Sequence, residues 1–403
     1  MSNFQPPTSS QSIGTFGGVE YVRHKGKFVG QTVGGAFAVP YEITAPANPR
    51  QGNGTSVVEP PHFTGGVVAR DGALGPLFMF GNKFSHVSVG YSNFRGRILD
   101  PNPGFTPKIC GQDFPIPSPT TDLNILRQCA FVLRNNPPPF LGKVERVYGI
   151  GLSDSGNTVH EIYKHFGHKL FDITFACIAR YFEPVKINVA QKPIFVINTE
   201  ADFDARAVPN PNFPQYRWYG IPGAAHIPDS VLGRLSFPDP PPQGSPAPSI
   251  AGTSPLNWLP FLRALFVAGD RWARNVAPPP ASTTIKVNAR GEIARDARCN
   301  ALGGIRHPAL EAGEATFVAS VVRGNGWELF GGYGNPKRLE EGEFPEYLNT
   351  FRRAADALLA AKFLLPGGHA RLLREAQLQP PNTYTLNYLQ GRLFPRPASD
   401  ELD

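Results

Sequence analysis

Two segments near the N-terminus alternate between apolar and polar residues, the pattern of half-buried β-strands. They span residues 18–30 and 35–46 and are separated by a short glycine-bearing stretch, so we expect an antiparallel pair. Shorter apolar runs predict further strands within 55–66 and 85–94. Residues 1–12 are polar and contain proline, which predicts a flexible N-terminus.

From about residue 121 the apolar pattern switches repeatedly between a helical and a strand-like period. Helical spacing predicts three helices, over 121–136, about 154–167 and 257–275. Compact apolar runs predict strands over 143–151, 171–182, 192–206 and 216–226. Strands that alternate with helices are typical of a mostly parallel sheet covered on both faces. We therefore predict an α/β fold in which the first two strands form an antiparallel edge.

The regular alternation stops towards the C-terminus. Residues 228–255 are rich in Pro, Gly and Ser, and we interpret them as a lid-like loop. Beyond 276 the pattern predicts one helix, over 347–364. The expected organisation is a flexible segment (1–12), one α/β core (13–275), and a C-terminal extension (276–403) that packs back onto the core.

Composition and charge exclude several classes of protein. The 403 residues are 41% apolar and 18% charged, which is typical of a globular chain. The net charge of +7 comes from dispersed basic residues, so we expect no nucleic-acid binding. No apolar run reaches the length of a membrane span. No basic segment followed by an apolar run opens the chain, so we see no signal peptide and expect a cytoplasmic protein.

The cysteines and histidines do not predict a metal or redox site. Cys110, Cys129, Cys177 and Cys299 are widely spaced and form no Cys-x-x-Cys pair. The segment "HEIYKHFGH" holds His160, His165 and His168, but no acid or cysteine follows at the offsets that metal motifs use. We therefore expect a protein that needs neither a metal nor an organic cofactor.

One serine lies at a junction that favours nucleophilic catalysis. The stretch "VYGIGLSDSGNTV" places Ser153 between an apolar strand and a helix. A nucleophile elbow has the pattern Gly-x-Ser-x-Gly, because the turn is too sharp for bulky neighbours. Here Ser155 replaces the last glycine and Gly156 follows. The alternative is that Ser153 or Ser155 merely caps the helix.

An acid and a histidine follow this serine in the order of an α/β-hydrolase triad. Asp202 comes just after the apolar run "IFVINT", and His226 lies in the small-residue turn "PGAAH". In such enzymes the acid orients the histidine, which activates the serine. We favour Asp202 as the acid because Thr199, three residues before it, closes the strand. Glu200 remains the alternative acid.

The triad implies an oxyanion hole built from backbone amides. One donor should be the N–H of Asp154, the residue after the nucleophile. The second should come from the loop "EPPHFTGG", where Pro60 and Pro61 have no N–H. His62 and Phe63 are therefore the candidates, with Phe63 preferred.

Several segments resemble a known family. "GLSDSG", "NTEADF" and "YGIPGAAHIPD" are similar to segments of the alpha/beta hydrolase domain family of bacteria and fungi. Its elbow usually reads Gly-x-Ser-Gln-Ser-Gly, so Asp154 stands where the family has Gln. "DRWARNVAPPPAS", "ALGGIRHPALEAGEATF" and "YLNTFRRAADALLAAKFLLP" resemble its C-terminal landmarks. The resemblance covers roughly residues 50–370, and it implies an α/β-hydrolase fold and hydrolysis of carboxylic esters.

The function we expect is that of a serine esterase acting on a small-molecule ester. The many phenylalanines of the chain favour a substrate with an apolar or aromatic part. Two alternatives stay open. A lactonase, amidase or acyltransferase would use the same three residues, and a hydrolase fold without catalysis would act as a binding protein.

Overall fold

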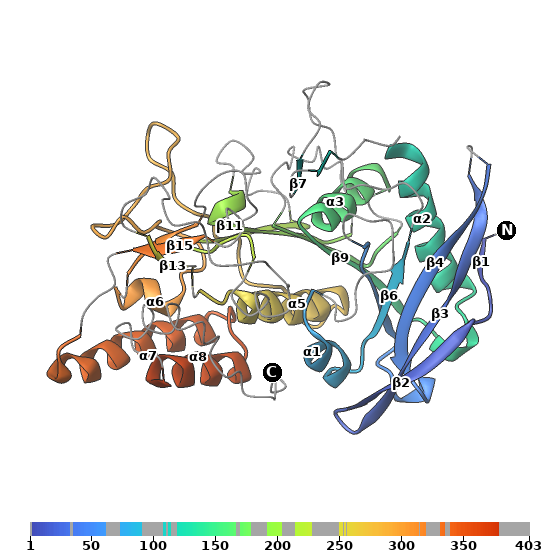
Figure 1. Ribbon diagram of the computed structural model, residues 1–403, viewed down its shortest axis with the longest axis horizontal. Helices are drawn as coiled ribbons and strands as arrows, with labels where there is room; N and C mark the ends of the chain where they lie inside the picture. The colour runs from blue at the N-terminus through green and yellow to red at the C-terminus, as the bar shows by residue number, and fades with distance from the viewer. Residues whose placement is uncertain are drawn as a thin grey trace.

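In a computed structural model of the chain, one large twisted sheet runs through the molecule between two layers of helices (Figure 1). The structure describes residues 2–32, 35–61, 73–90, 108–109, 112–113, 119–166, 170–178, 192–203, 214–227, 250–252, 254, 256–313, 315–319, 331–334 and 339–378. The large sheet is made of β1 (Asn3–Phe4), β2 (Ser9–Phe16), β3 (Val19–Thr32), β4 (Gly35–Pro46), β5 (Thr55–Val58), β6 (Ser85–Val89), β9 (Arg146–Leu152), β10 (Ile173–Cys177), β11 (Ile194–Thr199) and β12 (Tyr216–Ile221).

The strand order is β1-β3-β4-β6-β5-β9-β10-β11-β12, with β2 also paired to β3. Strands β6, β5, β9, β10, β11 and β12 run parallel to one another, whereas β3, β4 and β6 pair antiparallel. This confirms the predicted α/β fold with an antiparallel edge. Because neighbouring parallel strands end at the same edge of a sheet, residues that follow β9, β11 and β12 are brought together.

Helices cover both faces of the sheet, and the alternation of side chains along each strand explains how. Phe175 on β10 packs on one face, with its ring centroid 4.8 Å from that of Phe266 on α5. Its neighbour Ala176 packs on the other face with Val159 and Tyr163 of α3. Within the described residues the helices are α1 (Pro76–Gly81), α2 (Pro119–Asn135), α3 (Asp154–Phe166), α5 (Leu259–Ala273), α6 (Pro308–Glu311), α7 (Phe344–Ala360) and α8 (Pro366–Leu378).

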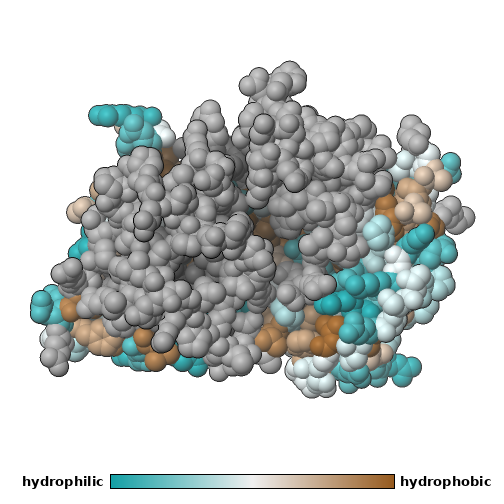
Figure 2. Space-filling view, in the orientation of Figure 1, coloured by the Kyte–Doolittle hydropathy of each residue, from teal (hydrophilic) through white to brown (hydrophobic). Residues whose placement is uncertain are grey.

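The N-terminal residues include two strands that the sequence pattern did not predict, while the boundary of a flexible segment at residue 12 stays a prediction. Strands β1 and β2 both pair antiparallel with β3. The physical reason is that β3 is 14 residues long, so its backbone offers hydrogen bonds along a full edge that polar strands can also use. The side chains of β2 are mostly exposed, and hydrophilic residues dominate this edge on the right of Figure 2.

The C-terminal region holds more structure than the single helix that the sequence predicts. Helices α6 and α8 accompany α7, and residues of α7 and α8 join the core beneath the sheet. Both helices escaped prediction because α6 has four residues and α8 opens with Pro-Gly-Gly. A small sheet of β13 (Ile250–Gly252), β15 (Gly332–Gly334) and β14 (Thr316–Val318) joins segments on both sides of residue 275. The division into core and extension stays a prediction.

A segment of the C-terminal region continues the large sheet past β12. The Thr283 amide donates to the Trp218 carbonyl at 3.0 Å, and the Gly220 amide donates to Thr283 at 2.9 Å. The Ile305 amide donates to the Gly220 carbonyl at 2.8 Å. The edge of β12 is thus covered, and the C-terminal region lies directly beside the strand that leads to His226.

Among the described residues, no helix combines the length and the apolar character needed to cross a bilayer.

Candidate active site

Ser153 lies on a strained turn between β9 and α3. Its φ is 57°, a left-handed conformation that is uncommon for a residue other than glycine. A Cβ at Gly151 would stand 2.1 Å from the Ser155 carbonyl oxygen, and one at Gly156 would stand 2.3 Å from that of Cys177. Both positions therefore exclude any larger residue. The strand, the turn and the helix approach one another as closely as the elbow pattern requires.

Ser155 explains how the elbow does without its last glycine. The Ser155 hydroxyl accepts a hydrogen bond from the Leu152 amide at 2.9 Å and donates one to the Leu152 carbonyl at 2.8 Å. Ser155 is fully buried, so these two hydrogen bonds stabilise the turn within the core. The sequence pattern showed that a small residue was needed here, but the pattern gave no sign of this contact.

Ser153, His226 and Asp202 form one hydrogen-bonded chain. Ser153 Oγ lies 2.9 Å from His226 Nε2. His226 Nδ1 lies 2.9 Å and 2.8 Å from the two carboxylate oxygens of Asp202. Asp202 and His226 are buried, with 3% and 7% of their surfaces exposed. The three residues come from different elements, namely the β9–α3 turn, the 3-10 turn Glu200–Asp202 after β11, and the turn after β12.

Glu200, the alternative acid of the sequence analysis, faces other groups. Its Oε2 accepts a hydrogen bond from the Gly223 amide at 2.7 Å, and its Oε1 accepts one from Arg295 Nη2 at 2.7 Å. Of the two acids, it is Asp202 that contacts the imidazole. The two side chains point in different directions because Glu200 and Asp202 are the first and last residues of one tight 3-10 turn.

This arrangement of strand order, elbow and hydrogen-bonded chain is the one that α/β hydrolases use. The sequence profile of the alpha/beta hydrolase domain family matches residues 37–374 of this chain. The chain belongs to that family. No curated protein matches the sequence. Among solved structures, a ferulic acid esterase from Streptomyces cinnamoneus matches with 13% identity and a TM-score of 0.36, over 54% of this chain and 78% of the esterase.

Other residues support the hydrolase site without having been predicted. Thr199 Oγ1 donates to Asp202 Oδ2 at 2.9 Å, which fixes the carboxylate. Trp258 Nε1 donates to the Ala225 carbonyl at 3.0 Å and so holds the turn that bears His226. Trp258 is fully buried and also belongs to the apolar core. Its second role depends on a contact between segments 33 residues apart.

The expected oxyanion donors are only partly within the described residues. Asp154 is the first residue of α3, and the amides in the first turn of a helix have no partner within the helix. The positive end of the helix dipole also favours a negative charge beside Ser153. His62 and Phe63 lie outside the described residues. All three donors stay predictions.

A buried cysteine lies next to the elbow. The Cys177 carbonyl accepts from the Ser153 amide at 3.0 Å, so this cysteine is a direct neighbour of the turn. Burial, and then the nearby Glu59, raise the pKa of the Cys177 thiol far above its usual range. Glu59 Oε2 in turn lies 3.0 Å from His86 Nε2. A protonated thiol is a poor nucleophile, whereas Ser153 Oγ contacts an imidazole nitrogen.

The two described histidines of α3 lie in different environments, since His160 is buried and His165 is exposed. Burial, and then the charge of Lys164, lower the pKa of His160 to about 3. His165 Nε2 lies 3.3 Å from Glu161 on the same helix, and His168 is outside the described residues. In the part of the chain that the structure describes, no group of three or more His, Cys, Asp or Glu side chains could hold a metal ion.

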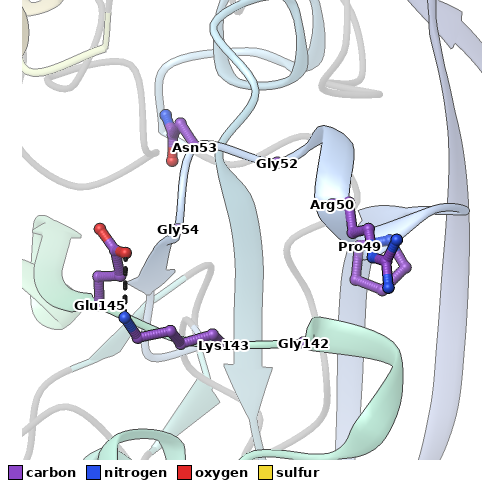
Figure 3. A pocket seen from close by; sticks show the side chains of 8 residues that line it. All are labelled: Pro49, Arg50, Gly52, Asn53, Gly54, Gly142, Lys143 and Glu145. Carbon is purple, nitrogen blue, oxygen red and sulfur yellow. Dashed lines mark ion pairs between the residues drawn. The ribbon is translucent and has the colours of Figure 1, made fainter.

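A surface pocket of about 540 Å³ opens at the opposite edge of the sheet (Figure 3). Its lining comes from the segments that lead into β5 and β9, whereas the site residues follow the far ends of their strands. Lys143 Nζ and Glu145 Oε1, which belong to one lining segment, form an ion pair of 3.5 Å (Figure 3). The pocket is therefore separate from the hydrogen-bonded chain of Ser153, His226 and Asp202.

Proposed function

We propose that this hydrolase cleaves carboxylic esters, with Ser153 as nucleophile, His226 as general base and acid, and Asp202 as the acid that orients His226. The observation that supports this most is the unbroken chain of contacts from Ser153 Oγ through both imidazole nitrogens to Asp202, at 2.8–2.9 Å. Distances of this kind allow direct proton transfer between Ser153 Oγ and His226 Nε2, and they let Asp202 hold the other imidazole proton on Nδ1. The strained Ser153 backbone adds to the support, because such strain is concentrated at functional sites.

The mechanism follows from these contacts. Ser153 Oγ attacks the ester carbonyl carbon while its proton passes to His226 Nε2. Asp202 keeps the other imidazole proton on Nδ1 and stabilises the imidazolium. The carbonyl electron pair moves onto oxygen, where the Asp154 amide and the dipole of α3 are available to stabilise it. When the tetrahedral intermediate collapses, the alcohol leaves as an alkoxide that takes the proton from His226 Nε2, and an acyl-serine remains. Water then attacks the acyl-serine and gives its proton to His226 Nε2. The carboxylic acid product leaves, and Ser153 Oγ takes that proton back.

The expected substrate is a small-molecule ester whose acyl or alcohol part is apolar or aromatic. A lactone, an amide or a second alcohol could enter the same cycle, because the three residues act on any activated carbonyl. A non-catalytic role is disfavoured, since a binding protein would have no use for a serine held at a left-handed φ against a buried imidazole.

The test is covalent labelling of Ser153 by a fluorophosphonate probe, followed by hydrolysis of a series of nitrophenyl esters. The parent protein should label and hydrolyse, and Ser153→Ala should lose both, with activity falling by about 10⁴ or more. Ser10→Ala is a matched control. Ser10 Oγ also lies 2.8 Å from a histidine, His24 Nδ1, but on an exposed strand without a helix N-terminus. This variant should behave like the parent. Labelling that persists in Ser153→Ala would refute the assignment.

A further inference from the structure

The buried carboxylate of Glu200 joins the two turns that bear Asp202 and His226. Glu200 opens the 3-10 turn that ends at Asp202, and it accepts the amide of Gly223, three residues before His226, at 2.7 Å. A second link runs beside it, from the Ala201 amide to the Ala224 carbonyl at 3.4 Å. A hydrogen bond to a carboxylate is shorter and stronger than one between neutral groups. The Glu200 contact is therefore the firmer of the two links.

The charge that balances Glu200 comes from the C-terminal region. Arg295 Nη2 lies 2.7 Å from Glu200 Oε1, and the side chain of Glu200 is 4% exposed whereas that of Arg295 is 41% exposed. A buried carboxylate without a charged partner is costly, so the native position of Glu200 depends on this guanidinium. The Arg295 side chain is partly exposed to solvent, and its guanidinium contacts the buried carboxylate of Glu200.

Arg295 is itself held by a local hairpin. Its backbone bridges to Ala301 in antiparallel fashion, and its Nη1 donates to the Cys299 carbonyl at 2.9 Å. The hairpin belongs to the segment that continues the sheet past β12. The guanidinium therefore has a fixed place relative to the turn that bears His226, which a side chain on a free loop would lack.

We propose that Arg295 is a positioning residue for His226, which it reaches through Glu200 and the Gly223 turn. Arg295 touches neither the reacting atoms nor the triad. It holds Glu200 in place, Glu200 holds Gly223, and the turn then presents the imidazole between Asp202 and Ser153. This gives the C-terminal region a direct part in the activity of the site. The inference rests on the proposed function, because it is measured through Ser153-dependent hydrolysis.

The first test is the Arg295→Ala variant. Its kcat for a nitrophenyl ester should fall about tenfold, because small errors in the position of catalytic groups lower rates steeply. KM should change less than about twofold, since Arg295 does not contact substrate, and the rate of fluorophosphonate labelling of Ser153 should fall in parallel. Arg290→Ala is the matched control. It removes the same charge from an exposed position of the same segment and should leave kcat unchanged.

Two further measurements separate positioning from a general loss of structure. Because Arg295 is partly exposed, added guanidinium at millimolar concentration should enter the vacated space and restore part of the kcat of Arg295→Ala. It should restore nothing in Ser153→Ala. In Glu200→Gln the further change Arg295→Ala should cost little, since the two residues act as one unit. Arg295→Lys, which keeps a positive charge, should retain an intermediate kcat and serves as the test variant if Arg295→Ala does not fold.

The results have distinct meanings. A folded Arg295→Ala with kcat within twofold of the parent would overturn the role of Arg295, as would losses that multiply fully in the double variant. If the parent itself shows no Ser153-dependent hydrolysis or labelling, the proposed function fails. An active parent with an unaffected Arg295→Ala overturns this inference alone.

Discussion

Replacing Asp202 by Asn removes one negative charge from the site and almost nothing else. The amide has the shape of the carboxylate and can keep the hydrogen bond from Thr199 Oγ1. It cannot keep both contacts to the imidazole. His226 Nδ1 lies 2.9 Å and 2.8 Å from the two oxygens, and one of these positions becomes an NH₂ group that faces an N–H. The imidazole is then driven towards the tautomer with its proton on Nε2, where it cannot accept the proton of Ser153.

The size of the effect follows from distance and burial. A carboxylate and an imidazolium about 4 Å apart attract each other by about 4 kcal/mol at an effective dielectric constant of about 20, which is a factor of about 10³ in rate. Asp202 is 3% exposed, so water cannot replace the lost charge. The unfavourable tautomer adds to this loss. We therefore expect kcat to fall by about 10⁴, the size that the same change has in a well-studied serine protease.

The assay compares Asp202→Asn with Glu200→Gln on the same ester. Both changes remove a charge, and the two residues are neighbours in one turn. Glu200 contacts Gly223 and Arg295, so its amide variant should lose about tenfold, roughly 10³ less than Asp202→Asn. Circular dichroism should show both variants folded. The reasoning would be refuted if Asp202→Asn kept a kcat within tenfold of the parent, or if Glu200→Gln were the more damaged variant.

Three further outcomes are expected. His226→Ala should lower kcat about as much as Ser153→Ala, since the two residues act as a unit; a loss of less than a hundredfold in steady-state assays would speak against His226 as the base. Gly151→Ala should prevent the native elbow, because its Cβ would overlap backbone at 2.1 Å, whereas Gly342→Ala has nothing within 4 Å and should change the melting temperature little. Burial lowers the pKa of His307 to about 3. In the unfolded chain His307 therefore takes up a proton below the ordinary pKa of histidine, about 6.5, whereas in the folded chain it stays neutral. The free energy of unfolding should thus fall as pH drops from about 6.5 to 3, with up to about 1.4 kcal/mol per pH unit due to this residue. His307→Asn, which can still cap α6, should show a shallower slope in urea titrations, and an unchanged slope would contradict the assignment.

The regular elements of the core were accessible from the sequence because each has a local cause. The apolar residues of α5 recur at a helical spacing, and β9 is a compact apolar run that the sheet buries on both faces. The glycines around Ser153 permit one sharp turn between strand and helix. The serine, the acid and the histidine also follow predicted strands in the chain order that an α/β hydrolase requires. These features need only neighbouring residues and general chemistry, so they predict the fold and the candidate site.

Tertiary structure decided what depends on groups far apart in the chain. The polar composition of residues 1–12 gave no sign of strands β1 and β2, which pair with the long edge of β3, because strand pairing is a property of two segments. Asp202 and Glu200 lie two positions apart in one acidic turn. Which of them faces His226 depends on the turn geometry, on Thr199, and on an arginine 95 residues away that engages Glu200. The sequence by itself determined which residue types meet at the end of the sheet, whereas their orientation depends on long-range contacts that no local pattern records.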